Sequence, residues 1–138
     1  MHAETNRLAS IYVPLRLIYG LVPVVAGLDK FLNLLTDWGR YLPPFLSQVL
    51  PVSPTTFLHA VGVIEIAAGL AVLTTFTRLG AYVVMAWLVL IAGNLIAAGY
   101  LDIAVRDLVM AAGAYALAQV AALRNERWIP AEFQIRAA

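Results

Sequence analysis

The sequence predicts an all-α fold, an integral membrane antiparallel four-helix bundle with a short interfacial segment between its first and second helices. The 138-residue chain is 62% hydrophobic and only 12% charged, about half the charged fraction of an average soluble domain. Four apolar segments are each long enough to cross a bilayer, which takes about 20 residues. The links between the last three segments are very short, which favours antiparallel neighbours. We therefore expect residues 1–138 to form a single transmembrane domain.

The first spanning helix is expected over residues 8–35, after a short polar tail. Its apolar centre, LIYGLVPVVAGL, belongs to a segment longer than the hydrophobic region of a signal peptide, so we expect a retained membrane helix. Pro23 removes one backbone hydrogen bond and should kink this helix. Arg16 lies within it, and Asp29 and Lys30 lie near its far end.

Residues 36–53, TDWGRYLPPFLSQVLPVS, are too polar and too short to span. Trp38 and Tyr41 are typical interfacial anchors, since their rings suit the headgroup level of a membrane. We expect residues 42–50 to form a short amphipathic helix at the interface, with two prolines in its first turn.

Three further spanning helices are expected over residues 54–76, 78–100 and 102–124. Gly62 and Gly69, one heptad apart, should let neighbouring backbones approach closely. Residues 125–138 form an amphipathic tail, in which Trp128 is expected to anchor at the membrane surface.

The distribution of basic residues predicts how the chain is oriented across the membrane. An even number of crossings places both termini on one side, and the basic excess lies there, at Arg7, Arg78, Arg124, Arg127 and Arg136. Because basic loops favour the cytoplasm, we expect the N-terminus and the C-terminus inside and the Trp38 segment outside. The net charge of +1, without a basic block, gives no argument for nucleic acid.

Glu65 lies at the centre of an apolar helix and needs a partner or a function. Arg16 should lie about 12 Å from the cytoplasmic end of its helix and Glu65 about 16 Å from the same side. These similar depths predict a buried ion pair between Arg16 and Glu65. The pair could be a structural clamp or a ligand or proton site; alternatively, Arg16 could extend to the headgroups.

A second cluster of charges is expected at the outer end, where the first helix ends and the last begins: Asp29, Lys30, Asp102, Arg106 and Asp107. Bridges from Asp29 to Arg106 or from Lys30 to Asp107 would make it an interfacial network. It could instead form the mouth of a pocket, with Trp38, Tyr41 and Tyr100 as the rim.

His59, Glu65 and Asn94 could line one polar crevice with an apolar floor, which would suit a quinone headgroup. Haem is not expected, because its two axial ligands usually come from facing helices, and the other histidine, His2, lies in the tail at the opposite side. No cofactor or metal site is predicted, and cysteine is absent. The chain carries no nucleotide-binding loop, G-x-S-x-G or H-E-x-x-H motif, so we assign no catalytic residue and lean against an enzyme.

The chain resembles the DoxX-like membrane family. The resemblance rests on Arg16, on G-L-D-K-F at residues 27–31, on G-V-I-E-I-A-A-G at residues 62–69, and on a tight turn followed by Arg78. It also includes an aspartate near the start of the last helix, Asp102 or Asp107, and would cover about residues 7–123. It implies a small four-helix protein of the bacterial cytoplasmic (inner) membrane. The family name comes from a subunit associated with a thiosulfate:quinone oxidoreductase, which implies a redox-linked accessory role.

Three functions remain open at this point. The first is a non-catalytic accessory or structural subunit of a larger respiratory or photosynthetic membrane complex, in contact with lipid and other membrane subunits or with itself. The second is a quinone- or lipid-binding redox partner that uses the Glu65, His59 and Asn94 crevice. The third is an oligomeric small transporter.

Overall fold

The computed structural model describes residues 2–128, with side chains for residues 7–46 and 48–128. In chain order it contains α1 (His2–Leu32), the 3-10 turn η1 (Trp38–Tyr41), α2 (Leu46–Val49), α3 (Pro54–Leu73), α4 (Thr77–Ala97) and α5 (Leu101–Leu123). Within the described residues, α1, α3, α4 and α5 are long and apolar enough to cross a membrane. The predicted all-α architecture of four spanning helices is therefore confirmed.

The helix boundaries differ from the predicted ones. α1 begins at His2 rather than at residue 8 and ends at Leu32 rather than at residue 35. It ends there because Asn33 takes a left-handed conformation with φ 50°. The Asp29 carboxylate then accepts hydrogen bonds from the backbone amides of residues 34 and 35. The other three long helices end one to three residues earlier than expected.

The connection from α1 to α3 does not form the predicted surface helix over residues 42–50. It forms η1 and the four-residue α2, with Pro43 and Pro44 between them rather than in a first helical turn. A residue that precedes proline is disfavoured in the helical region. Leu42, which precedes the proline pair, is accordingly extended, with φ −84° and ψ 132°.

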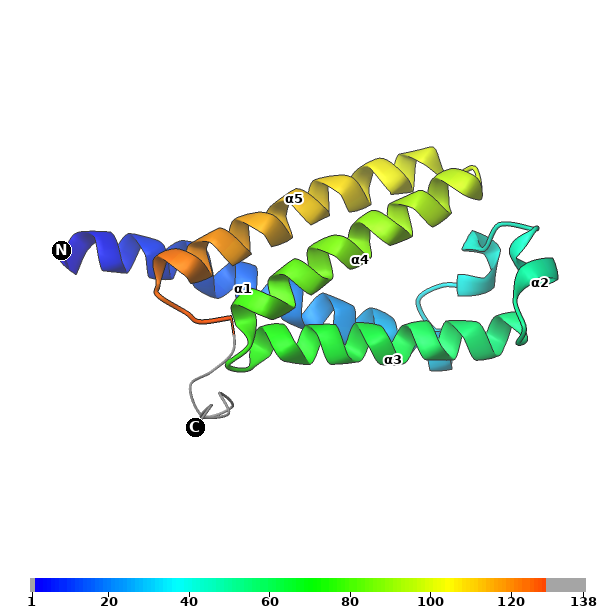
Figure 1. Ribbon diagram of the computed structural model, residues 1–138, viewed down its shortest axis with the longest axis horizontal. Helices are drawn as coiled ribbons and strands as arrows, with labels where there is room; N and C mark the ends of the chain where they lie inside the picture. The colour runs from blue at the N-terminus through cyan, green and yellow to red at the C-terminus, as the bar shows by residue number, and fades with distance from the viewer. Residues whose placement is uncertain (1, 129–138) are drawn as a thin grey trace, which may run out of the picture.

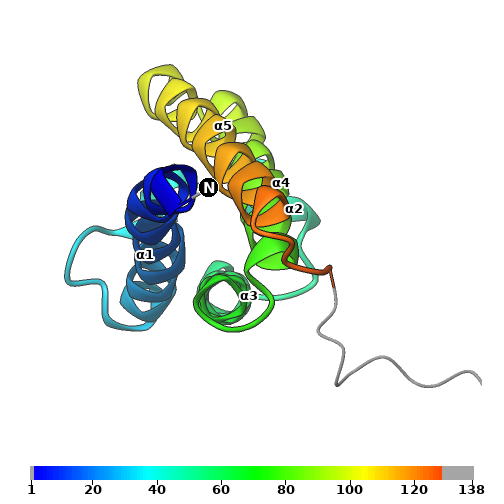
Figure 2. The same cartoon turned by 90° about the vertical axis from the view of Figure 1, so that its left-hand side faces the viewer.

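The four long helices form two antiparallel pairs, α1 with α3 and α4 with α5 (Figures 1 and 2). The start of α1, the α3–α4 turn and the end of α5 lie at one end of the bundle, called here the terminal end. The α1–α3 connection and the α4–α5 turn lie at the other, called the loop end. The two pairs diverge toward the loop end (Figure 1).

Glycines set the register between α1 and α3. A Cβ atom on Gly27 would lie 2.5 Å from the Gly62 carbonyl oxygen, and one on Gly62 would lie 2.6 Å from the Gly27 carbonyl oxygen. One heptad nearer the terminal end, a Cβ atom on Gly69 would meet the Gly20 carbonyl oxygen, whereas one on Gly20 would meet the Leu73 side chain. The two helix backbones approach too closely for a side chain at Gly27, Gly62 and Gly69, as in small-residue interfaces of membrane helices.

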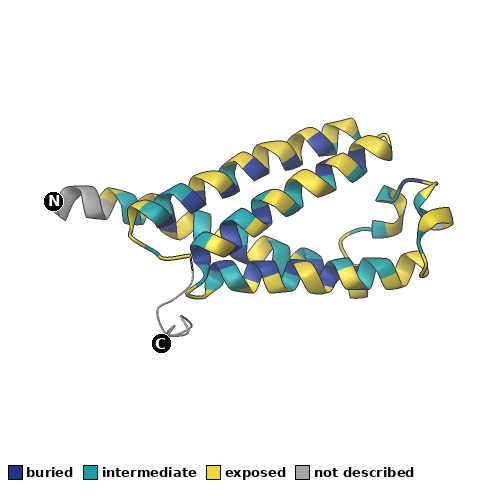
Figure 3. Cartoon of the chain, viewed as in Figure 1, coloured by how far each residue is buried: buried dark blue, intermediate teal, exposed yellow. Residues whose placement is uncertain are grey.

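Exposed residues lie along the outward faces of all four long helices (Figure 3). Many of them are large apolar side chains. Leu21, Ile64, Leu90 and Val109 are examples, one from each helix. Such a surface is too extensive and too apolar for water, and it suits the hydrocarbon core of a bilayer.

Candidate functional site

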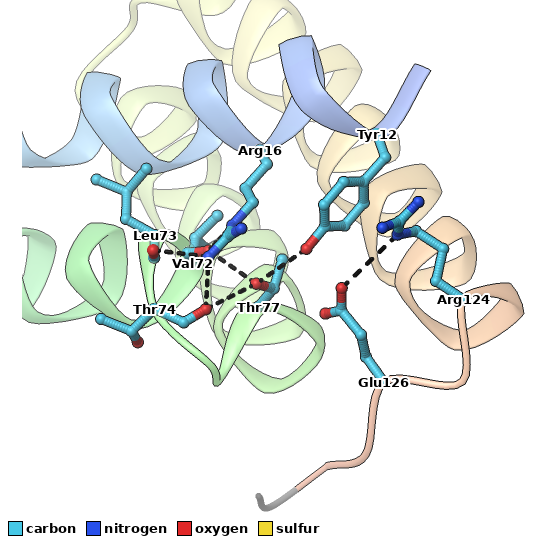
Figure 4. A network of polar contacts seen from close by, with 8 residues as sticks. All are labelled: Tyr12, Arg16, Val72, Leu73, Thr74, Thr77, Arg124 and Glu126. Carbon is cyan, nitrogen blue, oxygen red and sulfur yellow. Dashed lines mark hydrogen bonds and ion pairs between the residues drawn. The ribbon is translucent and has the colours of Figure 1, made fainter. Parts of the chain in front are cut away.

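At the terminal end, Arg16 of α1 reaches the last turn of α3 (Figure 4). Its Nε donates to the Val72 carbonyl at 3.0 Å, and its Nη2 donates to the carbonyls of Leu73 and Thr74 at 2.7 and 2.8 Å. The last carbonyls of a helix have no donor within the helix. The Arg16 guanidinium therefore caps α3 and ties it to α1.

Further side chains from α1, from the start of α4 and from the end of α5 extend this cluster (Figure 4). The Tyr12 hydroxyl donates to Thr77 Oγ1 at 3.3 Å, and Thr77 Oγ1 lies 3.0 Å from the carbonyl oxygens of both Val72 and Thr74. Arg124 lies over the Tyr12 ring, 4.5 Å from its centre. These contacts join α1, the α3–α4 turn and the end of α5, so the cluster holds the terminal end together.

Glu65 is paired with Lys30, not with Arg16. Lys30 Nζ lies 2.5 Å from Glu65 Oε2, and the two side chains are 5% and 6% exposed. Trp87 Nε1 lies 3.4 Å from the other carboxylate oxygen, Oε1. The predicted ion pair between Arg16 and Glu65 is therefore wrong.

The register and the direction of helical side chains explain this pairing. Because Gly27 faces Gly62, Arg16 is level with Leu73, eight residues and about 12 Å from Glu65 along the helix axis. Side chains in a helix point toward its N-terminus. Lys30 and Glu65 belong to antiparallel helices and so point toward each other, whereas Arg16 points away from Glu65.

A pocket of about 570 Å³ lies between the two helix pairs, in the half of the bundle nearer the loop end. Its walls come from residues 22–30 of α1, 57–68 of α3, 84–95 of α4 and 103–110 of α5, and residues 36–42 complete the lining. Most lining side chains are apolar or aromatic. Four of them are charged: Lys30, Glu65, Arg106 and Asp107.

Residues 36–42, called here the cover segment, are held by contacts to α1 and α4. Trp38 Nε1 donates to Asp29 Oδ2 at 2.8 Å, and Lys30 Nζ lies 3.7 Å from the centre of the Trp38 ring. Asn94 Nδ2 of α4 donates to the Tyr41 carbonyl at 2.8 Å. The predicted interfacial anchors Trp38 and Tyr41 therefore line the pocket and contact the helices directly.

The third predicted anchor, Trp128, also packs against the bundle. Its ring stacks on Tyr82 with the ring centres 5.0 Å apart, and the Arg78 guanidinium lies 4.1 Å from its centre. The rest of the predicted amphipathic tail, residues 129–138, lies outside the described residues.

The predicted charge cluster at the loop end is only partly assembled. Lys30, Arg106 and Asp107 share the pocket, whereas Asp29 binds the cover segment and Asp102 is exposed in the first turn of α5. Among the described side chains, ion pairs join Lys30 to Glu65 and Arg124 to Glu126. The predicted bridges from Asp29 to Arg106 and from Lys30 to Asp107 are therefore not formed.

Of the three residues in the predicted crevice, Glu65 and Asn94 line the pocket and His59 does not. His59 stacks on Phe31 with the ring centres 4.6 Å apart, at the α1–α3 contact. In the part of the chain that the structure describes, no group of three His, Cys, Asp or Glu side chains could hold a metal ion.

A match to the DoxX family covers residues 11–101, from within α1 to the first residue of α5. The chain belongs to the DoxX family. This DoxX-family protein is a small multi-pass membrane protein, and the family resemblance seen in the sequence is confirmed. The match includes Lys30, Glu65 and Asn94, whereas Arg106 and Asp107 lie beyond it. No curated protein and no solved structure matches the chain significantly.

Sequence reasoning missed Trp87 and the partnership of Lys30 with Glu65. The sequence did contain a signal for the partnership of Lys30 with Glu65. Gly20 and Gly27 repeat the heptad spacing of Gly62 and Gly69. Pairing the two glycine pairs in antiparallel order gives the observed register and places Lys30, not Arg16, nearer Glu65. Trp87 lies in the apolar middle of α4 and carried no such signal.

Proposed function

We propose that this DoxX-family protein is a quinone-binding accessory subunit of a redox-linked complex in the bacterial cytoplasmic membrane. The quinone headgroup would occupy the pocket between the helix pairs. The orientation proposed from the charge distribution places the loop end, and so the cover segment, on the outer side of the membrane.

The pocket itself carries the proposal. Its volume of about 570 Å³ lies within the range of about 300–1,000 Å³ typical of small-molecule sites. Apolar walls with a few convergent polar groups are also typical of such sites. Here the polar groups include Lys30, Glu65, Asp107 and the indole N–H of Trp87.

The route of entry supports a ligand that dissolves in the bilayer. Val22 of α1, Leu90 of α4 and Met110 of α5 line the pocket, and each is also an exposed apolar side chain. The apolar rim that these residues form continues the lipid-facing surface. A molecule with an isoprenoid or alkyl tail could therefore place its head in the pocket while its tail stays in hydrocarbon.

The balance of charge favours a neutral head. The two basic side chains of the pocket, Lys30 and Arg106, offset its two acidic ones, Glu65 and Asp107. A cationic or anionic ligand would leave one charge without compensation in an apolar setting, which is costly. A quinone ring is neutral and presents two oxygens for hydrogen bonds.

An accessory role fits the family and the surface. The DoxX resemblance implies association with a redox complex, and the exposed apolar helix faces offer contact area to lipid or to other membrane subunits. A quinone held here would exchange electrons with redox centres on those subunits.

The test is a pair of phenylalanine substitutions at adjacent positions. Ala26→Phe places a ring into the pocket, whereas Val25→Phe enlarges a side chain that is 52% exposed on the lipid-facing side. Binding of decylubiquinone to the full chain in lipid nanodiscs would be measured by titration calorimetry, with empty nanodiscs subtracted. Thermal unfolding would confirm that both variants fold.

We expect the wild-type chain and Val25→Phe to bind decylubiquinone with similar affinity. The affinity of Ala26→Phe should be at least tenfold lower. Quinone should also be extractable from the wild-type chain purified in mild detergent. Absence of binding by the wild-type chain, or equal binding by the two variants, would overturn the proposal.

A further inference from the structure

Asp107 is a buried acid without a partner in the described chain. Its side chain comes from α5 into the pocket wall, and the residue is only 9% exposed. No described group donates a hydrogen bond or forms an ion pair with its carboxyl. Ionisable side chains within membrane helices almost always have a partner, so a carboxyl that faces the pocket without one is available to a ligand.

The neighbouring polar groups cannot supply that partner without giving up their own. Lys30 is held by Glu65 at 2.5 Å and by the face of the Trp38 ring. Both Glu65 oxygens are occupied, one by Lys30 and the other by the Trp87 indole. Asp107 is thus the acidic group of the pocket that remains available to a ligand.

We infer that Asp107 binds the polar head of the ligand and makes the pocket selective for the hydroxyl form of that head, a quinol, over the carbonyl form, a quinone. This inference rests on the proposed function, because it concerns the same pocket and the same class of ligand.

The selectivity follows from the inventory of donors and acceptors. An ionised carboxylate only accepts hydrogen bonds, and a protonated one donates a single bond while its other oxygen still accepts. A quinol hydroxyl donates and accepts, so it satisfies Asp107 in either protonation state. A quinone carbonyl only accepts, so it leaves Asp107 partly or wholly without a partner in both states.

A ligand that leaves a buried polar group of the site without a hydrogen bond binds much more weakly than a similar ligand that forms this bond. We expect quinol to bind at least tenfold more tightly than quinone. For a two-electron couple, a tenfold preference for the reduced form raises the reduction potential of the bound ligand by about 30 mV. The pocket would therefore hold quinol as a poorer reductant than free quinol in the bilayer.

The experiment compares decylubiquinol, kept reduced under anoxic conditions, with decylubiquinone in nanodiscs that hold the full chain. Three chains are titrated: wild type, Asp107→Asn and Asp102→Asn. Asparagine has nearly the shape of aspartate, and its amide can donate to a carbonyl, so Asp107→Asn should bring the ratio of the two dissociation constants close to one. Asp102 is exposed five residues earlier on the same helix, so Asp102→Asn should keep the wild-type ratio.

The outcomes separate the two proposals. Equal binding of both forms by the wild-type chain overturns the inference and leaves quinone binding intact. A quinol preference that persists in Asp107→Asn also overturns it. Failure of the wild-type chain to bind either form overturns both. If Asp107→Asn does not fold, Asp107→Glu tests the same point, because it retains the acid and should keep the quinol preference.

Discussion

Replacing Lys30 by methionine should strongly destabilise this protein, because it leaves Glu65 as a buried charge without its cation. The two side chains are 5% and 6% exposed and their charged atoms are 2.5 Å apart. Removing one partner of a buried ion pair costs about 3–5 kcal/mol. The Trp87 indole, 3.4 Å from Glu65 Oε1, remains and compensates for only part of this loss.

Adding Glu65→Gln to Lys30→Met should restore much of the stability, since a neutral amide costs far less to bury than an unpaired carboxylate. The double-mutant cycle should therefore give an interaction free energy of about 2–3 kcal/mol. When two substitutions are far apart, their effects on the unfolding free energy usually add to within about 0.5 kcal/mol. The matched cycle of Arg16→Met with Glu65→Gln should be additive at that level, because Arg16 is level with Leu73 on α3.

Both cycles can be measured by reversible unfolding in mixed detergent micelles containing increasing SDS, followed by circular dichroism. Correct membrane insertion of each variant is the control. The reasoning would be refuted if the Arg16 cycle showed coupling and the Lys30 cycle were additive. That result would mean that Glu65 pairs with Arg16, as helix depth alone predicts, and not with Lys30.

Other parts of the structure are tested by Gly62→Ala with Gly93→Ala as its control, by Arg16→Met alone, and by Asn94→Leu. Gly62→Ala should lower the unfolding free energy by about 1–3 kcal/mol, because its Cβ would meet the Gly27 carbonyl. A Cβ atom on Gly93 would have no neighbour within 4 Å, so Gly93→Ala should leave the unfolding free energy unchanged or raise it slightly. Similar unfolding curves for Gly62→Ala and Gly93→Ala would contradict the close approach of α1 and α3 at Gly27 and Gly62. Arg16→Met should lower the unfolding free energy by at least about 1.5 kcal/mol, because α3 loses its cap. It should also speed amide hydrogen exchange in the α3–α4 turn, and unchanged exchange there would disprove the capping role. Asn94→Leu removes the hydrogen bond to the Tyr41 carbonyl and should raise exchange in the cover segment several-fold, with exchange in the α3–α4 turn as the internal control.

The number and order of the spanning helices could be predicted from the sequence because they depend on local properties. A run of about 20 apolar residues must form a helix in a bilayer, where every backbone group needs a partner within the chain. The short links after residues 73 and 97 then leave only antiparallel neighbours. The same local signals gave the DoxX resemblance, which rests on short motifs within the helices and on one tight turn between them.

The polar contacts within the bundle could not be predicted in this way. Depth along each helix placed Arg16 and Glu65 close together, but contact also requires the axial register and the direction of each side chain. The glycine contacts between α1 and α3 set that register, and the antiparallel arrangement turns Lys30 and Glu65 toward each other. The sequence by itself therefore determined that Arg16 and Glu65 lie within apolar spanning segments. Only the tertiary structure decided that Lys30 neutralises Glu65, that Arg16 caps α3 and that Asp107 faces the pocket without a partner, because these outcomes depend on how separate helices are aligned.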